Sequence, residues 1–421
     1  MALRAEPTAV VGWGSLNPLG ADANSTWDAV IAGRSGIETL QTPWTEDLPV
    51  RLAGCVPMGA LNSLPPILCR RSDRCAQLAL AAAREAWSMA SSITTGLDPS
   101  RIAVVIGTGI GGLATMHEQH TQLSAGGASR VNPLTVPMLI PDAAAGQVAI
   151  DLGLLGGAHT PVSACASGAE ALMLGQMLLN DDRADLVLAG GSEAPVNRLG
   201  LVGFAAMRAL SSRNDDPDQA SRPYGLGRDG FVLSEGAGVL ALMRQQDTPP
   251  GADLGWLLAS GSSSDAHHIV APEPQGLQAS RAIDDALRRA EVSPADLCGV
   301  QAHATGTNLG DLAEARALRR SLGSAADHLP VYAPKGQLGH LLGGAGAVET
   351  ILALQALHHG VMPGSLNADP LDPEVELAVT KQGPVQLSSD QGQRLLLKNA
   401  FGFGGHNISL VLAGSKSAQP G

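Results

Sequence analysis

The sequence predicts a duplicated α/β fold, because two distant segments of the chain share one order of expected elements. In the first segment, a helix over residues 75–89 is followed by a turn at Pro99 and by an apolar strand that ends in Gly-Thr-Gly. In the second, a helix over residues 276–290 is followed by a turn at Pro294 and by a strand that ends in His-Ala-Thr-Gly. A repeated order of this kind predicts two similar halves, each built from alternating strands and helices.

A second correspondence supports this fold: each half contains an apolar segment that turns into a helix through small residues. One of these turns carries Cys165 and the other carries His340. The polar stretch at 244–253 separates the two copies, so we expect an N-terminal half over residues 1–250 and a C-terminal half over residues 251–421. Reactive residues at the strand ends of both halves would then meet at a shared cleft.

The composition of the chain argues against several classes of partner and location. With 421 residues the chain is long enough for two structural units, and its formal net charge of −12 argues against a nucleic-acid partner. No apolar run approaches the length of a transmembrane helix or of a signal-peptide core, so we expect no membrane span and a cytoplasmic location. An odd number of cysteines without a Cys-x-x-Cys pair suits a reducing compartment. These are Cys55, Cys69, Cys75, Cys165 and Cys298.

The early elements are short and are separated by glycine and proline. Residues 9–11 are expected to form a strand that runs into a glycine turn, and residues 24–32 a short helix that ends at Gly33. Residues 41–66 are rich in proline and should be irregular. Residues 121–141 contain Gly, Ser and Pro, and we expect them to form a lid or an interface loop.

One predicted strand ends in a glycine-rich run that matches Gly-x-Gly-x-x-Gly at Gly107, Gly109 and Gly112. A dinucleotide-binding fold also needs an acidic residue about 20 positions later, at the end of a second strand. Between residues 113 and 141 the only acidic residue is Glu118. We therefore favour a tight backbone turn at this run over a cofactor site.

Cys165 lies in the segment TPVSACASG, where small residues crowd it on both sides. Such neighbours permit a sharp strand-to-helix turn that would direct the sulfur into a cleft, and the start of the following helix would favour the thiolate over the thiol. A lone cysteine among alanines is more often a small buried hydrophobe, so this stretch alone leaves catalysis and core packing open. The same alternative applies to Leu172 and Met173 on that helix, which either touch a substrate or fill the core.

Two of the 11 histidines differ from the others in their surroundings. His303 and His340 each end an apolar segment among small residues, which would let a ligand approach the backbone. Taken singly, a histidine at a strand end is more often structural. Together with Cys165, however, the pair could support acyl-thioester chemistry, in which the thiolate holds an acyl group while the imidazoles polarise a second substrate. No Cys/His group has the spacing of a structural zinc site, so we expect no metal.

Five segments, in order, resemble the elongating β-ketoacyl-(acyl carrier protein) synthases of type II fatty-acid synthesis and their polyketide relatives. The segments are VSACASGAEA, ASRPYGLGRDGFVLSEGAGVL, QAHATGTNLGD, PKGQLGHLLGGAGAVE and NAFGFGGHN. In VYAPKGQLGH and GGHN the chain is most similar to the mycobacterial long-chain subgroup. The resemblance extends over residues 100–412 and more weakly to the N-terminus. It implies a thiolase-like duplicated fold with a layered α-β-α-β-α core.

The resemblance implies a decarboxylative condensation in which Cys165 takes the acyl chain from its carrier. His303 and His340 would bind the malonyl thioester, promote loss of carbon dioxide and stabilise the enolate. The backbone N–H groups of Cys165 and Phe403 would form the oxyanion hole, and Phe403 would also gate the acyl pocket. The product would be a β-ketoacyl-ACP, formed during chain elongation in fatty-acid or type II polyketide synthesis.

The resemblance also implies supporting and binding residues. Thr305 and Thr307 match positions that touch the phosphopantetheine arm. Lys335 and Glu349 match a charged pair that supports the site, and Asp311 belongs to the associated H-x-T-x-T-x-x-x-D pattern. Arginines that could receive an acidic carrier protein are Arg70, Arg71, Arg130 and Arg208.

No bound cofactor is implied, since the substrates, acyl-ACP and malonyl-ACP, arrive on the phosphopantetheine arm of acyl carrier protein. Both a homodimer and a heterodimer with a related ketosynthase-like subunit are compatible with the resemblance. An alternative function is a catalytically inactive partner of the chain-length-factor type, but such subunits typically lack the nucleophile that Cys165 supplies. A thiolase would need a second catalytic cysteine near its C-terminus, and no cysteine follows Cys298. An initiating synthase would use Cys-His-Asn, whereas His340 supports the two-histidine type.

Two positions depart from the family pattern. Ala304 stands where the family usually has glycine, and we expect its methyl group to be tolerated. Gly336 stands where the family usually has Ser or Thr, which removes a hydroxyl near the site. We expect this second departure to alter the rate or polarity of the site rather than to abolish function.

Overall fold

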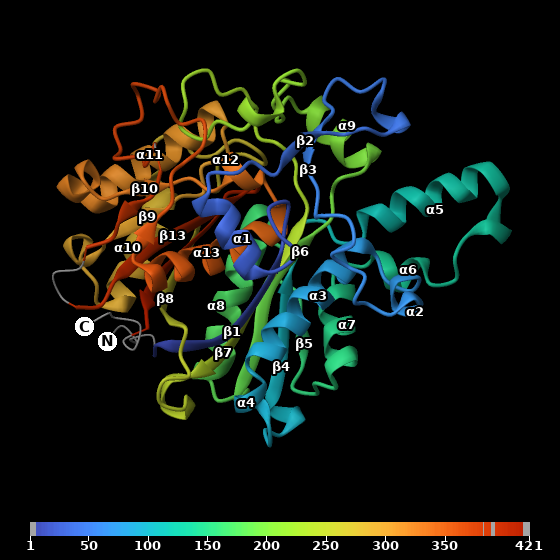
Figure 1. Cartoon of the computed structure of the whole chain (residues 1–421), viewed down its shortest axis with the longest axis horizontal. Helices are drawn as coiled ribbons and strands as arrows, with labels where there is room; N and C mark the ends of the chain where they lie inside the picture. Colours follow the sequence, from blue (N-terminus) through green and yellow to red (C-terminus); the bar gives the residue numbers. More distant parts are fainter. Residues whose placement is uncertain (1–5, 382, 389–391, 416–421) are drawn as a thin grey trace.

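The computed structural model describes residues 6–381, 383–388 and 392–415. Its main sheet has ten strands in the order β10-β9-β13-β14-β8-β1-β7-β6-β4-β5 (Figure 1). The strands of the first half are β1 (Thr8–Leu16), β4 (Ile102–Gly107), β5 (Ala158–His159), β6 (Leu186–Glu193) and β7 (Gly236–Arg244). Those of the second half are β8 (Gly255–Ser264), β9 (Gly299–Gln301), β10 (Val331–Tyr332), β13 (Leu395–Gly402) and β14 (His406–Gly414).

The order of the strands repeats between the two halves of the sheet. Read outward from the centre, the first half runs β1-β7-β6-β4-β5 and the second runs β8-β14-β13-β9-β10. The pairing directions repeat as well, because β4 is parallel to both its neighbours and so is β9, whereas β7 and β14 are antiparallel to theirs. The halves join where residues 8–10 of β1 pair antiparallel with residues 255–257 of β8. The predicted duplication is therefore confirmed.

Helices form the outer layers and the central layer around these strands. α3 (Arg74–Met89) and α7 (Ala143–Leu152) pack on the first half, and α10 (Leu277–Ala290) packs on β8 and β14 with α11 (Asn308–Leu322) beside it (Figure 1). Between the halves lie α8 (Ser167–Asn180) and α13 (Ala345–His359), and α13 contacts strands of both. The layers thus follow the predicted α-β-α-β-α order. The predicted repeats also correspond in space, since α3 matches α10 and α8 matches α13.

Glycine lets the central helices approach the strands and each other closely. A Cβ atom added to Gly107, at the end of β4, would lie 2.3 Å from the carbonyl oxygen of Ser167. A Cβ atom added to Gly168, in the first turn of α8, would lie 2.8 Å from the carbonyl oxygen of Gly343. Side chains here would push the starts of the central helices away from the sheet. Close backbone packing of this kind explains how a chain with 3% aromatic residues fills a large core.

The stretch over residues 121–141, which we expect from sequence to be a loop, is largely helical. α5 (Leu113–Gly126) extends away from the rest of the molecule, and α6 (Thr135–Leu139) follows it (Figure 1). Most side chains of α5 are at least partly exposed, so the helix has no apolar stripe that sequence periodicity could reveal. The remaining elements are α1 (Ala23–Ile31), α2 (Pro66–Cys69), α4 (Ser91–Thr94), α9 (Arg198–Ala206), α12 (Lys335–Leu338) and the paired strands β2 (Ile37–Thr39) with β3 (Leu52–Gly54) and β11 (Val361–Met362) with β12 (Val385–Gln386).

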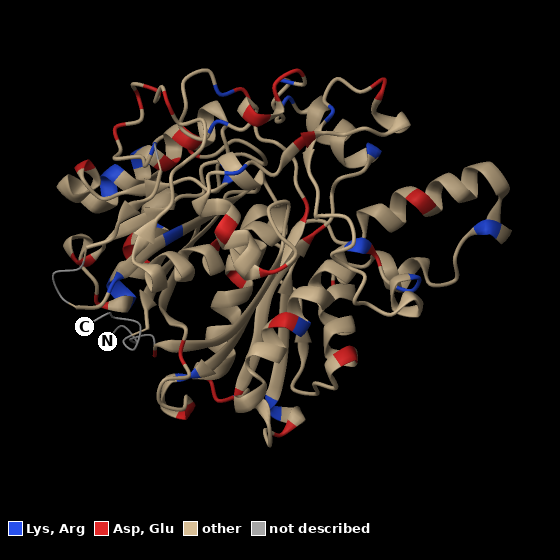
Figure 2. Ribbon diagram, viewed as in Figure 1, with Lys and Arg blue, Asp and Glu red and all other residues tan. Residues whose placement is uncertain are grey.

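The predicted boundary segment, residues 244–253, lies between β7 and β8, and the division of the chain at residue 250 stays a prediction. Charged residues gather on the outer helices and loops, whereas the central strands carry few of them (Figure 2). Within the residues that the structure describes, no helix combines the length and the apolar character that crossing a bilayer requires.

Candidate active site

A cavity of about 330 Å³ is lined by residues from both halves of the sheet. Cys165 comes from the first half, and His303, His340 and Phe403 come from the second. The predicted phosphopantetheine-binding residues, Thr305 and Thr307, also line it. The structure therefore brings together, in one cleft, side chains that lie far apart in the sequence.

Cys165 lies in a sharp turn, η4 (Ala164–Ala166), directly before α8. Ala164 has a φ of 51°, in the left-handed region that favours glycine, so the turn carries backbone strain. The hydroxyl of Ser167 stabilises the turn by accepting the N–H of Ser163 at 2.9 Å and donating to the carbonyl oxygen of Ala164 at 2.7 Å. The predicted turn into a helix is thus present, and it presents Cys165 to the cleft.

Burial raises the pKa of the Cys165 thiol to about 12, although the Lys335 ammonium and the backbone N–H groups of Phe403 and Cys165 act in the opposite direction. The backbone N–H at the helix start thus favours the thiolate, as the sequence predicts, but burial outweighs its effect on the pKa of the thiol. Removing the sulfur from water disfavours its charged form by more than the nearby N–H groups and ammonium stabilise it. The two N–H groups nevertheless face the sulfur, where they could bind an oxyanion formed on an attached acyl group.

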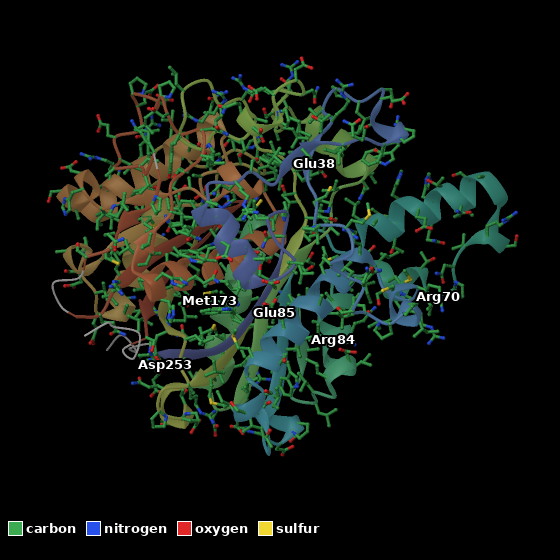
Figure 3. All side chains as sticks on the ribbon, in the orientation of Figure 1. Glu38, Arg70, Arg84, Glu85, Met173 and Asp253 are labelled. Atoms are coloured by element: carbon green, nitrogen blue, oxygen red, sulfur yellow. The ribbon has the colours of Figure 1, made fainter. Side chains whose placement is uncertain are left out.

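Leu172 and Met173, on the helix that follows Cys165, belong to the core. Leu172 is 1% exposed, and Met173 (Figure 3) is partly buried against the same apolar cluster. Neither Leu172 nor Met173 is among the described residues that line the cleft. Core packing is thus the role that the structure supports for both.

Phe403 lies in the turn between β13 and β14, which comes close to Cys165. A Cβ atom added to Gly402 would lie 2.5 Å from the carbonyl oxygen of Ser163, so this approach requires glycine. Gly404, on the other side of Phe403, has a φ of 83°. The ends of this turn therefore depend on glycine, while Phe403 lines the cleft and directs its N–H toward the sulfur.

His303 follows β9, and the carboxylate of Glu314 on α11 holds its backbone. The N–H of His303 donates to Glu314 Oε1 at 2.8 Å, and the N–H of Ala304 donates to Oε2 at 2.7 Å. The ring of His303 lies beside that of His340, with centroids 5.5 Å apart and an interplanar angle of 82°. Two adjacent and nearly perpendicular imidazoles can therefore face one ligand in the cleft.

His340 is held through its backbone, which pairs with the strand-like segment before β7. Its N–H donates to the carbonyl of Val232 at 2.7 Å, and its carbonyl accepts the N–H of Ser234 at 3.0 Å. The ring stacks edge-on against Phe231 at 5.1 Å and is almost completely buried. Within the described part of the chain, neither ring nitrogen of His340 has a hydrogen-bond partner. A buried imidazole in this state is available to a group that a substrate brings.

Both imidazoles of the cleft are held in the neutral form. Burial lowers the pKa of His303 and of His340 well below 6.5, and the positive charges of Lys335 and Lys398 lower both further. The neighbouring His340 also lowers the pKa of His303. A neutral imidazole offers one N–H donor and one acceptor nitrogen, so each ring can donate a hydrogen bond to a substrate oxygen.

Lys335 fixes which nitrogen of His303 carries the proton. Its ammonium forms an ion pair with Glu349 Oε1, donates to the carbonyl of His303 at 2.6 Å and lies 3.4 Å from His303 Nδ1. An ammonium can only donate, so Nδ1 accepts and the proton of the neutral ring lies on Nε2. This tautomer is assigned from the hydrogen-bond network, and it gives His303 an N–H donor on its other edge.

Thr305 and Thr307 lie at the cleft, and Asp311 organises the loop that carries them. The two threonine hydroxyls are 3.0 Å apart. Asp311 accepts the N–H of Gly306 at 3.0 Å and that of Tyr224 at 2.7 Å, and burial raises its pKa to about 7. Its carboxyl group thus fixes the backbone of the loop that carries Thr305 and Thr307, without lining the cleft itself.

The two departures from the family pattern have different structural settings. Ala304 has a φ of 22°, at the edge of the region that favours glycine, so its side chain is accommodated at a conformational cost. At Gly336 a Cβ atom would lie 2.6 Å from the carbonyl oxygen of Leu366. The neighbouring backbone therefore fills the space that a side chain at Gly336 would occupy.

The four arginines proposed for carrier docking are exposed, but only one of them lines the cleft. Arg208 lines the cavity. Arg70 (Figure 3) and Arg71 follow α2, and Arg130 ends η3 (Ala128–Arg130) after α5. The structure thus places Arg208 at the cleft and the others on the side of the molecule that carries α2 and α5.

The glycine-rich run after β4 is filled by a carboxylate of the chain itself. Glu193, at the end of β6, accepts the N–H groups of Gly109 (2.6 Å), Ile110 (3.1 Å) and Gly111 (3.2 Å). It also accepts the N–H of Gly343 at 3.1 Å, from the loop after His340, and the hydroxyl of Thr108 at 2.9 Å. The N–H groups that would cradle a phosphate in a dinucleotide site are thus already bound. The tight-turn interpretation of this run is the one that the structure supports.

Sequence reasoning missed three buried charged residues around the site: Glu193, Glu314 and Lys398. Glu314 follows Asp311 by three positions on one helix, and this spacing places both on one face. Lys398 follows three leucines in a strand, so the apolar run was a signal that it is buried. In the part of the chain that the structure describes, no group of three or more His, Cys, Asp or Glu side chains could hold a metal ion.

Comparison with known proteins gives a consistent result over nearly the whole chain. The model of a family described as the β-ketoacyl synthase N-terminal domain matches residues 5–248, and that of the β-ketoacyl synthase C-terminal domain matches residues 254–369. The chain is 38% identical to a 3-oxoacyl-[acyl-carrier-protein] synthase 2 of Staphylococcus aureus, over 96% of this chain and 97% of that protein. It is 39% identical to the protein of the same name from Mycobacterium bovis, over 96% of each.

Solved structures resemble the fold over a similar extent. A type II polyketide ketosynthase, solved with its acyl-carrier protein and bound to the hexaketide, has a TM-score of 0.89 and 27% identity, covering 98% of this chain and 100% of that one. The ishigamide ketosynthase/chain length factor gives the same values. A β-ketoacyl synthase from Burkholderia phymatum has a TM-score of 0.87 and 27% identity, covering 97% of this chain and 100% of that one.

Proposed function

The chain belongs to the β-ketoacyl synthase family, and we propose that its cleft condenses an acyl group with malonyl-ACP to form β-ketoacyl-ACP. The observation that carries this proposal is the convergence of Cys165, His303 and His340 on one cavity. One group is a nucleophile held beside two backbone N–H groups, and the others are neutral imidazoles with free ring nitrogens or a fixed tautomer. These are the groups that acyl transfer followed by decarboxylation requires.

In the first step, the sulfur of Cys165 attacks the thioester carbonyl of the acyl carrier. A new S–acyl bond forms, the bond to the phosphopantetheine sulfur breaks, and that sulfur takes up the proton that the Cys165 thiol gives up. The oxyanion that forms on the way would be bound by the N–H groups of Cys165 and Phe403, which face the sulfur. These donors need no reorganisation, because the turn of Gly402 and the turn of Ala164 already fix them.

In the second step, malonyl-ACP loses carbon dioxide and leaves an enolate on the thioester. Nε2–H of His303 and an N–H of His340 would donate to the thioester oxygen as its negative charge develops. The neutral ring of His303 suits this task, because its Nδ1 can accept from Lys335 while its Nε2–H remains free to donate. The enolate carbon then attacks the acyl group on Cys165, the carbon–sulfur bond breaks, and the released sulfur takes up a proton to restore the thiol.

Two substitutions at the nucleophile test the proposal. Cys165→Ala should abolish acyl loading and condensation, whereas Cys165→Gln should retain decarboxylation of malonyl-ACP without condensation. Mass spectrometry of the acyl-enzyme and release of labelled carbon dioxide report the two steps separately. Cys69→Ala, a partly exposed cysteine outside the cleft, is the matched control and should leave both unchanged. Condensation by Cys165→Ala would refute the proposal.

The substrates would arrive on acyl carrier protein, with Thr305 and Thr307 along the phosphopantetheine arm and Phe403 as the gate. Support comes from a relative that was solved with its acyl-carrier protein. Arg70, Arg71, Arg130 and Arg208 would receive the acidic carrier. Charge reversal at a docking arginine should raise the KM for acyl-ACP with little change in kcat, and should not affect a short acyl-pantetheine substrate.

The chain would work as a dimer, with itself or with a related subunit, in the cytoplasm. Relatives include a ketosynthase/chain length factor pair, so an inactive partner of the chain-length-factor type is the second candidate. Cys165, His303 and His340 in one cleft favour the active enzyme, because an inactive partner has no use for them together. Acyl loading on Cys165 of the protein expressed alone would separate the two.

A further inference from the structure

Arg228 is a buried arginine that binds the backbone of the loop carrying Thr305 and Thr307. Its side chain is 1% exposed. Nε donates to the carbonyl oxygen of Thr307 at 3.3 Å, and Nη2 donates to that of Asn308 at 3.4 Å. Nη1 donates to the carbonyl oxygen of Gly225 at 3.2 Å. The guanidinium thus links the loop at the cleft to the segment that precedes β7.

Two carboxylates balance the charge of Arg228. Asp372 Oδ2 accepts from Nη1 at 2.6 Å, and Asp311 Oδ2 lies 3.6 Å from Nε. A buried guanidinium is costly unless it is paired and hydrogen-bonded. Each of the three nitrogens of Arg228 has at least one acceptor, so the side chain is held in one place.

Main-chain contacts join the same two segments on either side of Arg228. The N–H of Gly230 donates to the carbonyl oxygen of Gly306 at 3.1 Å, and the N–H of Tyr224 donates to Asp311 at 2.7 Å. Residues 222–230, from the first half of the fold, therefore pack along the loop that follows β9 in the second half. The main chain fixes this loop at Gly306, whereas the side chain of Arg228 fixes it at Thr307.

The hydroxyl of Thr307 does not take the role that its position at the start of α11 predicts. Thr307 is the N-cap residue of this helix, where a threonine hydroxyl ordinarily accepts an N–H of the first turn. In the described part of the chain it makes no such bond and lies 3.0 Å from the hydroxyl of Thr305 instead. Both threonines line the cavity. Because this hydroxyl does not hold the helix end, the guanidinium of Arg228 is the side-chain group that holds the backbone of Thr307.

We propose that Arg228 is a positioning residue for the phosphopantetheine arm: its guanidinium holds the carbonyls of Thr307 and Asn308, so that the hydroxyls of Thr305 and Thr307 face the arm. The inference rests on the proposed function, because the arm is the group that these hydroxyls would bind. Arginine suits this role, since its planar fork donates from three nitrogens at once, whereas lysine donates from a single nitrogen.

The test measures loading of Cys165 from two thioesters with the same acyl chain, by mass spectrometry of the intact protein. Octanoyl-pantetheine has the amide-containing arm, and S-octanoyl-2-mercaptoethanol lacks it. Arg228→Lys keeps the charge but has one nitrogen, and Arg228→Gln removes the charge as well. Both should raise the KM for octanoyl-pantetheine about tenfold, which corresponds to about 1.4 kcal/mol, the size of one or two hydrogen bonds to the arm. The kcat for this substrate, and kcat/KM for S-octanoyl-2-mercaptoethanol, should change by less than about twofold.

Two comparisons show whether the effect passes through the threonines. Arg84→Gln, at an arginine on α3 that binds Asp151 outside the cleft, is the matched control and should leave loading from both thioesters unchanged. Thr305→Val and Thr307→Val remove the two hydroxyls at nearly constant size. In this doubly substituted background, Arg228→Lys should raise the KM for octanoyl-pantetheine no further, because groups that act as one unit are not additive.

The outcomes separate this inference from the proposed function. If the wild type loads Cys165 neither from octanoyl-ACP nor from either thioester, the proposed function fails and the inference fails with it. If the wild type loads and a folded Arg228 variant keeps the KM for octanoyl-pantetheine within about twofold of the wild type, the role of Arg228 alone is refuted. An equal loss with both thioesters would mean that Arg228 only maintains the fold, which also refutes the inference. If neither Arg228 variant folds, Asp372→Ala, which removes the carboxylate 2.6 Å from the guanidinium, decides by the same comparison.

Discussion

Replacing Glu193 with glutamine hardly changes the size of the side chain, but it should clearly lower the free energy of unfolding. Its two carboxylate oxygens accept five hydrogens: Oε1 accepts from Thr108, Ile110 and Gly111, and Oε2 accepts from Gly109 and Gly343. Glutamine turns one oxygen into an amide nitrogen, which can only donate. Whichever oxygen is replaced, at least two backbone N–H groups then lose their acceptor.

The magnitude follows from the cost of leaving those groups buried without a partner. Each unsatisfied buried N–H costs about 1–3 kcal/mol, so two cost about 2–6 kcal/mol. Removing a buried charge offsets part of this loss, since burial raises the pKa of Glu193 against the effect of the Gly109, Gly111 and Gly343 N–H groups. We expect the free energy of unfolding to fall by about 2–4 kcal/mol.

Urea unfolding at pH 7.5, followed by circular dichroism, measures this change by linear extrapolation. The control is Glu46→Gln, at an exposed glutamate, which should alter the free energy of unfolding by less than about 0.5 kcal/mol. A loss below about 1 kcal/mol for Glu193→Gln would refute the reasoning. It would mean that the carboxyl is already protonated in the fold and that one oxygen does not accept as the geometry indicates.

Three further predictions concern packing, backbone strain and pH. Gly107→Ala should destabilise the fold by about 2–3 kcal/mol, because its Cβ would collide with Ser167. Gly146→Ala on α7 has open space around it and should be neutral or stabilising by up to about 1 kcal/mol. Urea unfolding compares the pair, and equal effects would contradict the packing argument. Ala304→Gly should keep full activity and stabilise by up to about 1 kcal/mol, since it relieves a positive φ, and a melting temperature below that of the wild type would count against this. The decarboxylation rate should stay constant as the pH falls from 7.5 through 6.5, because the lowered pKa of His303 and His340 delays their protonation; a half-maximal rate at or above pH 6.5 would contradict it.

Sequence reasoning could reach the parts of this protein that leave a local pattern. The order of helix, proline turn and strand repeats in both halves, and the sheet repeats accordingly. Cys165, His303 and His340 each end an apolar segment among small residues, and such segments bring side chains to the edge of a layered fold. Their meeting in one cleft follows from the duplication together with these three positions.

What sequence reasoning missed depends on contacts between distant segments. The pKa of Cys165 is set by how completely its sulfur is removed from water, and no local pattern reports that. Glu193 fills a glycine-rich turn more than 80 residues away, and Lys398 shares Glu349 across the central layer. α5 was missed because it makes few buried contacts. A helix without a buried apolar stripe leaves no periodic signal in the sequence.

Because the two halves supply different parts of the site, the order of synthesis has a consequence for the cell. A ribosome that has completed only the first half has made Cys165 but neither histidine and not the turn of Phe403. Under the proposed mechanism, a nascent chain at that stage would have the thiol but no imidazole pair with which to decarboxylate a malonyl thioester. Unfinished chains would then be unable to consume the substrate until the second half has folded against the first.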